Sequence, residues 1–317
     1  MANHSPSWIR KNISGPVFPL VTPFDVRGDI DYPALHSYIN FLTACNAETI
    51  MTTVGTSRFN LLTNEEICAV NETLASATTS DIVSIAAGPM TGSLETNIEF
   101  AKHAESSGLD AYIVYYPERW YGSQAVFDFF RKIASSVSIA VMIHELPMRN
   151  GYGGQIQYPL DLLEQLMTIP NIVGMKEECM DAGYSYQLHR RLHDNCAIIG
   201  AGAMRNFMRD YHAGARANLV GIGSFFPRVE MAFQKAFKSG DIDRAHNIVR
   251  DYEDPYFDVA VKLGWHPQLK ETMSLLGLMP KYERAPLSCL DKVQSRILRD
   301  SIEKMGWLNL SPDHIPH

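Results

Sequence analysis

A lysine stands at the end of an apolar run in residues 171–179, which read NIVGMKEEC. Lysine is among the residues least often buried, so this position needs a reason. Desolvation disfavours the ammonium form, lowers the pKa of a lysine and makes free amine available. A neutral amine can attack a ketone to give a Schiff base, which stabilises a carbanion on the adjacent carbon. Lys176 is therefore a candidate nucleophile, unless it only forms a structural ion pair with Glu177 or Glu178.

Further polar side chains follow other apolar segments of the chain. His144 has an intrinsic pKa near neutrality and suits proton transfer, or it could be a hydrogen-bonded wall residue. After Gly55, the hydroxyls of Thr56 and Ser57 could hold the carboxylate of a 2-oxo acid, or they could only shape a turn. Arg149 could bind a second anionic group through two hydrogen bonds, or it could pair with a neighbouring glutamate.

These residues would meet in a closed barrel of alternating strands and helices. Short, apolar, β-branched runs recur along the chain at 15–21, 48–54, 82–88, 111–116, 138–144, 171–176, 196–201 and 218–223. Continuous apolar runs are typical of parallel strands buried on both faces, and amphipathic segments with helical spacing separate them. The pattern predicts a (β/α)₈ TIM barrel, in which residues at the C-terminal ends of the strands converge on the active site.

The pattern changes after Phe225, where helical segments continue without further strands. The first of these helices is expected to close the barrel, and the others to form a helical extension. The predicted organisation is an N-terminal arm over residues 1–13, a catalytic barrel over 14–238 and a C-terminal extension over 239–317.

The composition, 46% hydrophobic and 20% charged over 317 residues, is typical of a globular protein. A formal net charge of −7 argues against nucleic acid or an anionic membrane as a partner. No apolar run reaches the roughly 18 to 20 residues that span a bilayer, and the opening MANHSPSWIRKN lacks the apolar centre of a signal peptide, which favours a cytoplasmic protein. The five scattered cysteines and eleven histidines show no disulfide or metal-ligand spacing, so no metal or other cofactor is expected.

The order of these motifs resembles the dihydrodipicolinate synthase / N-acetylneuraminate lyase family of class I aldolases. Over residues 14 to about 290, the chain has GPVFPLVTPFDVRGDID at its first strand, VGTSRFNLLTNEE at the place of the family's G-T-T-G-E loop, ELPMRNG at its Y-N-x-P-x-R-x-G stretch and IVGMKEE at its I-x-G-x-K-E/D motif. The resemblance implies a Schiff base between Lys176 and pyruvate or a pyruvate-yielding keto-deoxy sugar acid, with aldol cleavage or condensation. It also implies a homotetramer, and it assigns substrate contacts to Gly55, Thr56, Ser57 and Arg149.

The chain departs from the family pattern in several places. His144 replaces the family's tyrosine on strand 5, and Arg58 and Phe59 replace its Gly-Glu after the two hydroxyl residues. Arg58 is interpreted as a loop salt bridge rather than a substrate clamp. The departures leave two alternatives open: a dehydratase of a keto-deoxy sugar acid that uses the same imine, and a metabolite-binding protein of this fold without turnover.

Overall fold

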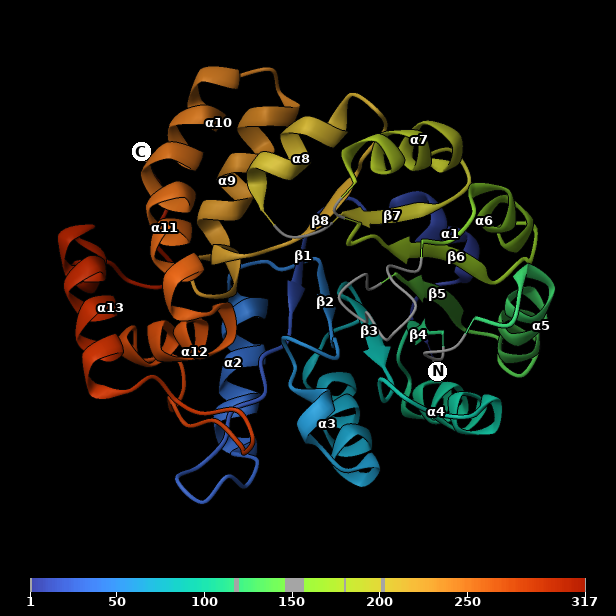
Figure 1. The fold of residues 1–317 in the computed structure, drawn as a ribbon, viewed down its shortest axis with the longest axis horizontal. Helices are drawn as coiled ribbons and strands as arrows, with labels where there is room; N and C mark the ends of the chain where they lie inside the picture. Colours follow the sequence, from blue (N-terminus) through green and yellow to red (C-terminus); the bar gives the residue numbers. More distant parts are fainter. Residues whose placement is uncertain (1, 117–119, 146–156, 180, 201–202, 317) are drawn as a thin grey trace.

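The computed structural model describes residues 2–116, 120–145, 157–179, 181–200 and 203–316. Eight parallel strands form a closed barrel in chain order, with β8 pairing back to β1 (Figure 1). The strands are β1 (Gly15–Pro19), β2 (Thr49–Met51), β3 (Val83–Ala87), β4 (Ala111–Tyr115), β5 (Ala140–His144), β6 (Ile172–Lys176), β7 (Ala197–Gly200) and β8 (Ala217–Leu219). The predicted (β/α)₈ barrel is confirmed.

Each predicted apolar run contains one strand or overlaps it, although the strands are shorter than the runs. Every strand residue except Pro16 is buried, because side chains fill the inside of the barrel and helices cover its outside. The register pairs Tyr115 with His144, and His144 with Lys176. The last residues of β4, β5 and β6 therefore lie side by side at one end of the barrel.

A ring of helices surrounds the strands (Figure 1). These are α2 (Tyr32–Ala44), α3 (Asn64–Ala77), α4 (Leu94–Ser107), α5 (Ser123–Ala134), α6 (Leu160–Leu166), α7 (Ala182–Leu192), α8 (Met204–Tyr211) and α9 (Pro227–Lys238). Local sequence signals explain several of their ends. Thr63 and Glu66 form a capping box at the start of α3, and α4 ends at Gly108, which has a φ of 86°.

The N-terminal segment contains a short helix, α1 (Pro6–Asn12), that packs against β5, β6 and β7. The guanidinium of Arg10 donates a hydrogen bond of 2.7 Å to the carbonyl oxygen of Ile172, the first residue of β6. This helix therefore covers the N-terminal ends of the strands, opposite the end where Lys176 lies.

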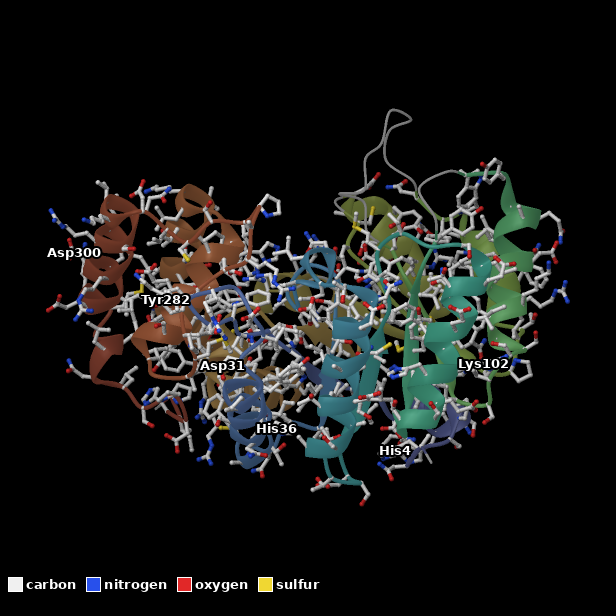
Figure 2. The ribbon with its side chains drawn as sticks, turned by 90° about the horizontal axis from the view of Figure 1, so that it is seen from below. His4, Asp31, His36, Lys102, Tyr282 and Asp300 are labelled. Atoms are coloured by element: carbon white, nitrogen blue, oxygen red, sulfur yellow. The ribbon has the colours of Figure 1, made fainter. Side chains whose placement is uncertain are left out.

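The C-terminal extension flanks the barrel beside α2 and α9 (Figure 1). It contains α10 (Ile242–Ile248), the π-helical turn η3 (Val249–Glu253), α11 (Asp254–Leu263), α12 (Trp265–Leu275), α13 (Lys292–Lys304) and the 3₁₀ turn η4 (Trp307–Asn309). Two further 3₁₀ turns, η1 (Phe59–Leu61) and η2 (Ile222–Ser224), lie in the barrel region of the described chain. In the perpendicular view of Figure 2, Tyr282 and Asp300 of this region lie on the opposite side of the molecule from Lys102 of α4. None of the helices in the described part of the chain is both long and apolar enough to cross a membrane.

Candidate active site

Lys176 is the last residue of β6, and its side chain is 1% exposed. It lies on the wall of a cavity of about 660 Å³ at the C-terminal ends of the strands. Gly174 allows β6 to lie close to β7 at this point, because a Cβ on this residue would overlap the carbonyl oxygen of Ala197. The position is the one that the barrel prediction gives to an active-site residue.

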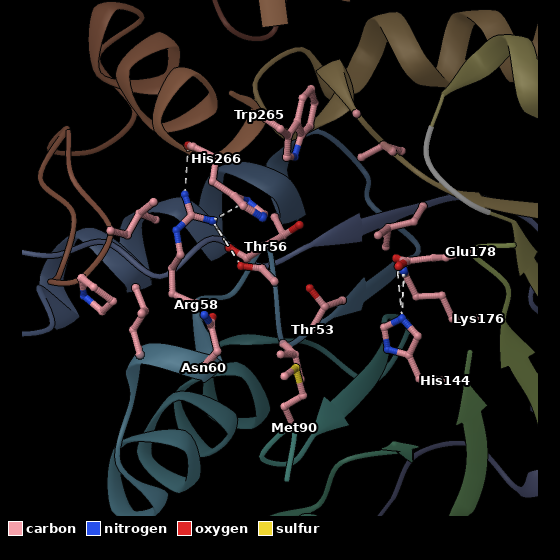
Figure 3. Close-up of a pocket in the computed structure, with 18 of the residues that line it drawn as sticks. Thr53, Thr56, Arg58, Asn60, Met90, His144, Lys176, Glu178, Trp265 and His266 are labelled. Carbon is pink, nitrogen blue, oxygen red and sulfur yellow. Dashed lines mark hydrogen bonds and ion pairs between the residues drawn. The ribbon is translucent and has the colours of Figure 1, made fainter. Parts of the chain in front are cut away.

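Three ionisable side chains meet at this end of the cavity (Figure 3). The Nζ atom of Lys176 is 3.1 Å from Nε2 of His144 and is in direct contact with the carboxylate of Glu178. The Nε2 atom of His144 is 3.6 Å from Oε1 of Glu178. Tyr115 packs on the imidazole with a centroid distance of 4.3 Å, and its hydroxyl accepts a hydrogen bond of 3.0 Å from the N–H of Val54.

Burial favours the free amine of Lys176, and two neighbouring carboxylates oppose it. Burial lowers the pKa of Lys176 to about 7, and the negative charge of Glu177 opposes this shift. The carboxylate of Glu178, which contacts Nζ, also favours the ammonium form. The amine can therefore lose its proton near neutral pH, with a carboxylate and an imidazole in reach to receive it.

The loop after β2 brings Gly55 and Thr56 to the cavity wall, whereas Ser57 is not among the described residues that line it. The Ser57 hydroxyl donates a hydrogen bond of 2.5 Å to the carbonyl oxygen of Leu20 and accepts one of 2.9 Å from the N–H of Thr53. Both bonds fix the loop, so a substrate contact by Ser57 stays a prediction without support from this geometry.

Arg58 holds the same loop in place. Its backbone has a left-handed φ of 62°, and its guanidinium lies 2.6 Å from the carboxylate of Glu283 in an ion pair whose side chains are at most 1% exposed. The guanidinium also donates hydrogen bonds to the carbonyl oxygens of Thr56, at 2.9 Å, and His266, at 3.0 Å. Arg58 forms the salt bridge expected from the sequence, and the residue also lines the cavity.

Arg149, for which a substrate contact is predicted, lies outside the described residues.

Sequence reasoning missed several lining residues, which are Thr53, Met90, Glu178, Phe257, Trp265 and His266. Glu178 was visible in the KEE sequence, but only as a structural partner of the lysine. Phe257 and Trp265 belong to α11 and α12, and no local motif indicates that these helices contribute to the cavity.

The donor set suits covalent amine chemistry with proton transfer. Within the described ranges, no group of three or more His, Cys, Asp or Glu side chains is placed to hold a metal ion. His266 is neutral at pH 7, because burial, and then the charge of Arg58, lower its pKa to about 4. An amine, an imidazole and a carboxylate in mutual contact can form an imine and move protons beside it.

A (β/α)₈ barrel with a buried lysine at the end of β6 is the architecture that the motif resemblance implies. The model of the dihydrodipicolinate synthetase family matches residues 12–305. The chain belongs to the dihydrodipicolinate synthetase family.

One curated relative and two solved structures are similar to the chain at low identity. The chain is 26% identical over 302 residues to a 4-hydroxy-tetrahydrodipicolinate synthase from Chlorobaculum parvum, which covers 93% of this chain and 98% of the relative. A prophage protein of the dihydrodipicolinic acid synthase family from E. coli K12, solved in complex with pyruvate, superposes with a TM-score of 0.82 at 20% identity, over 93% of this chain and 99% of its own. An N-acetylneuraminate lyase from Mycoplasma synoviae superposes with a TM-score of 0.77 at 22% identity, over 91% and 97% of the two chains.

Proposed function

We propose that the protein is a class I aldolase-type lyase that binds a 2-oxo acid, pyruvate or a pyruvate-yielding keto-deoxy sugar acid, as a Schiff base on Lys176. The observation that carries the proposal is the contact of a buried amine, whose pKa is about 7, with His144 and Glu178 at a cavity wall. Family membership supports it, and so does the pyruvate in the complex of the E. coli K12 relative.

The reaction begins when the neutral amine of Lys176 attacks the C2 carbonyl carbon of the 2-oxo acid. The carbinolamine oxygen takes up a proton and leaves as water, which gives a protonated imine. Loss of a proton from C3 then gives an enamine, which attacks an aldehyde in the condensation direction. Cleavage is the reverse, with the imine as the electron acceptor. No metal or other cofactor is needed for these steps.

The proton transfers are assigned to His144 and Glu178, which lie 3.1 Å from Nζ and in contact with it, respectively. Gly55 and Thr56 line the same cavity and are assigned to the substrate carboxylate. A dehydratase is the second candidate, and the presence of Glu178 favours it. One of two acid–base groups beside the imine can remove the C3 proton while the other protonates a leaving hydroxyl on C4.

The test is reductive trapping of the purified protein with borohydride and a panel of 2-oxo acids, followed by mass spectrometry of peptides. Pyruvate is expected to give an adduct on Lys176. A panel that gives no adduct on this residue refutes the Schiff-base proposal. Product analysis with keto-deoxy sugar acids separates the two reactions, since an aldolase releases pyruvate and a dehydratase releases water without it. Trapping without either product would favour a binding protein without turnover.

A further inference from the structure

The cavity has two chemically different ends. Figure 3 shows Lys176, His144 and Glu178 together on one side, and Trp265, His266 and Arg58 on the other. A 2-oxo acid bound through Lys176 occupies the first end. A second substrate that reacts at C3 therefore extends toward the second end, whose composition determines which substrate can bind there.

The second end has an aromatic wall built by the C-terminal extension. The rings of Phe257 and Trp265 are stacked, with centroids 5.4 Å apart and planes 16° apart, and both residues are only partly buried. They pack on the backbone at Gly221, where a Cβ would lie 3.4 Å from the Phe257 ring and 3.5 Å from the Trp265 ring. Leu219 and Val220 line the cavity next to them. The wall thus offers an aromatic surface of the kind that binds planar apolar groups.

The described charges at the second end of the cavity do not favour a second anionic group. Of the lining residues that the structure describes, the lysine and arginine side chains are Lys176, which is the nucleophile, and Arg58. Arg58 is 1% exposed and is neutralised by Glu283 at 2.6 Å. His266 is neutral, and Glu178 lies at the first end of the cavity, in contact with Lys176. A phosphate or second carboxylate at the second end would therefore find no available cation among the described lining residues.

One further cation lies near the aromatic wall. The guanidinium carbon of Arg205 is 4.6 Å from the centroid of the Phe257 ring. Arg205 pairs with Asp254 at 3.4 Å and is not one of the described residues lining the cavity. Its charge is therefore balanced outside the space that the second substrate would occupy.

We propose that the second substrate is an uncharged aromatic aldehyde whose ring packs against Trp265. This inference rests on the proposed function. The C3 atom of the enamine on Lys176 forms a bond with the aldehyde carbon, and the aldehyde oxygen takes up a proton, which balances the proton lost from C3. Water then hydrolyses the imine, which restores the lysine and releases a 4-hydroxy-2-oxo acid.

A matched pair of aldehydes tests the proposal with the wild-type protein and pyruvate. Benzaldehyde and 4-carboxybenzaldehyde share the ring and differ in charge, and glyceraldehyde serves as an uncharged polar aldehyde. We expect kcat/KM for benzaldehyde to exceed that for each of the others by about tenfold or more, the discrimination that a small change in an apolar pocket supplies. An equal or higher kcat/KM for 4-carboxybenzaldehyde or glyceraldehyde, or no consumption of benzaldehyde, overturns the proposal.

A variant pair tests the aromatic wall itself. We expect Trp265→Leu to lower kcat/KM for benzaldehyde by about tenfold, mainly through KM, and to leave trapping of pyruvate on Lys176 unchanged. The control is Trp8→Leu on α1, where the residue is 41% exposed, and it should change neither quantity. An unchanged kcat/KM in Trp265→Leu overturns the inference alone. Absence of a pyruvate adduct in the wild-type protein refutes the proposed function instead.

Discussion

Replacement of Glu178 by glutamine is expected to lower the pKa of Lys176 and to move imine formation to lower pH. The carboxylate contacts Nζ, and its side chain is 25% exposed. An opposite charge this close raises the pKa of an amine by roughly 1 to 3 units, and partial exposure to solvent places the effect near the lower limit. Loss of the charge should therefore lower the pKa by about 1 unit, equivalent to about 1.4 kcal/mol.

The assay is the initial rate of trapping with pyruvate and cyanoborohydride as a function of pH. At a pH below the pKa of Lys176, a fall of about 1 unit in this pKa raises the free-amine fraction by up to about tenfold, so trapping at pH 6 should be several times faster in the variant. Near pH 9 the lysine is deprotonated in both proteins, and this advantage disappears. Glu99→Gln, at an exposed position of α4, is the matched control and should leave the profile unchanged. A midpoint for Glu178→Gln that stays in place or moves to higher pH would refute the reasoning.

Three further outcomes are expected. His144→Gln should leave pyruvate trapping intact but slow the exchange of the C3 protons of pyruvate with D₂O by about 100-fold, because a general acid–base group is lost. The exchange is followed by NMR, and an unchanged rate would show that His144 only forms part of the cavity wall. Glu283→Gln should destabilise the fold by about 3 kcal/mol or more and lower the Tm in a thermal scan, because Arg58 and Lys270 would remain buried without their counter-charge. An unchanged Tm would contradict this expectation. Peptide mapping after reductive trapping should find the pyruvate adduct on Lys176 and none on Lys270. An adduct on Lys270 and none on Lys176 would contradict the assignment of Lys176 as the nucleophile.

The barrel could be predicted from the sequence because its strands are buried on both faces. This burial produces continuous apolar runs that alternate with amphipathic helices, and both signals are local. The same reasoning placed Lys176 and His144 at neighbouring strand ends, and the register of β5 and β6 pairs them. Positions at strand ends follow from topology alone, so this part of the site needed no knowledge of tertiary contacts.

The rest of the site depends on contacts that no local pattern encodes. The hydroxyl of Ser57 is directed to the carbonyl of Leu20, and a sequence motif does not specify the direction of a side chain. Trp265 reaches the cavity because the extension folds back on the barrel. Lys270 of α12 fixes this arrangement by donating a hydrogen bond of 2.6 Å to the carbonyl oxygen of Thr22, after β1. These partners are 248 residues apart in the chain, so the aromatic wall could not be predicted from either segment.

The comparison of Lys176 with Lys270 shows what distinguishes a nucleophile from a structural cation. Burial lowers the pKa of each lysine to about 7, and their side chains are 1% and 0% exposed. Lys270 donates to a backbone carbonyl and packs 4.3 Å from the centroid of the Phe24 ring, so no carbonyl carbon of a ligand can reach its amine. Lys176 ends a strand whose last side chain faces the cavity. Burial and a lowered pKa are thus shared by both, and access through the strand end makes Lys176 the candidate for covalent chemistry.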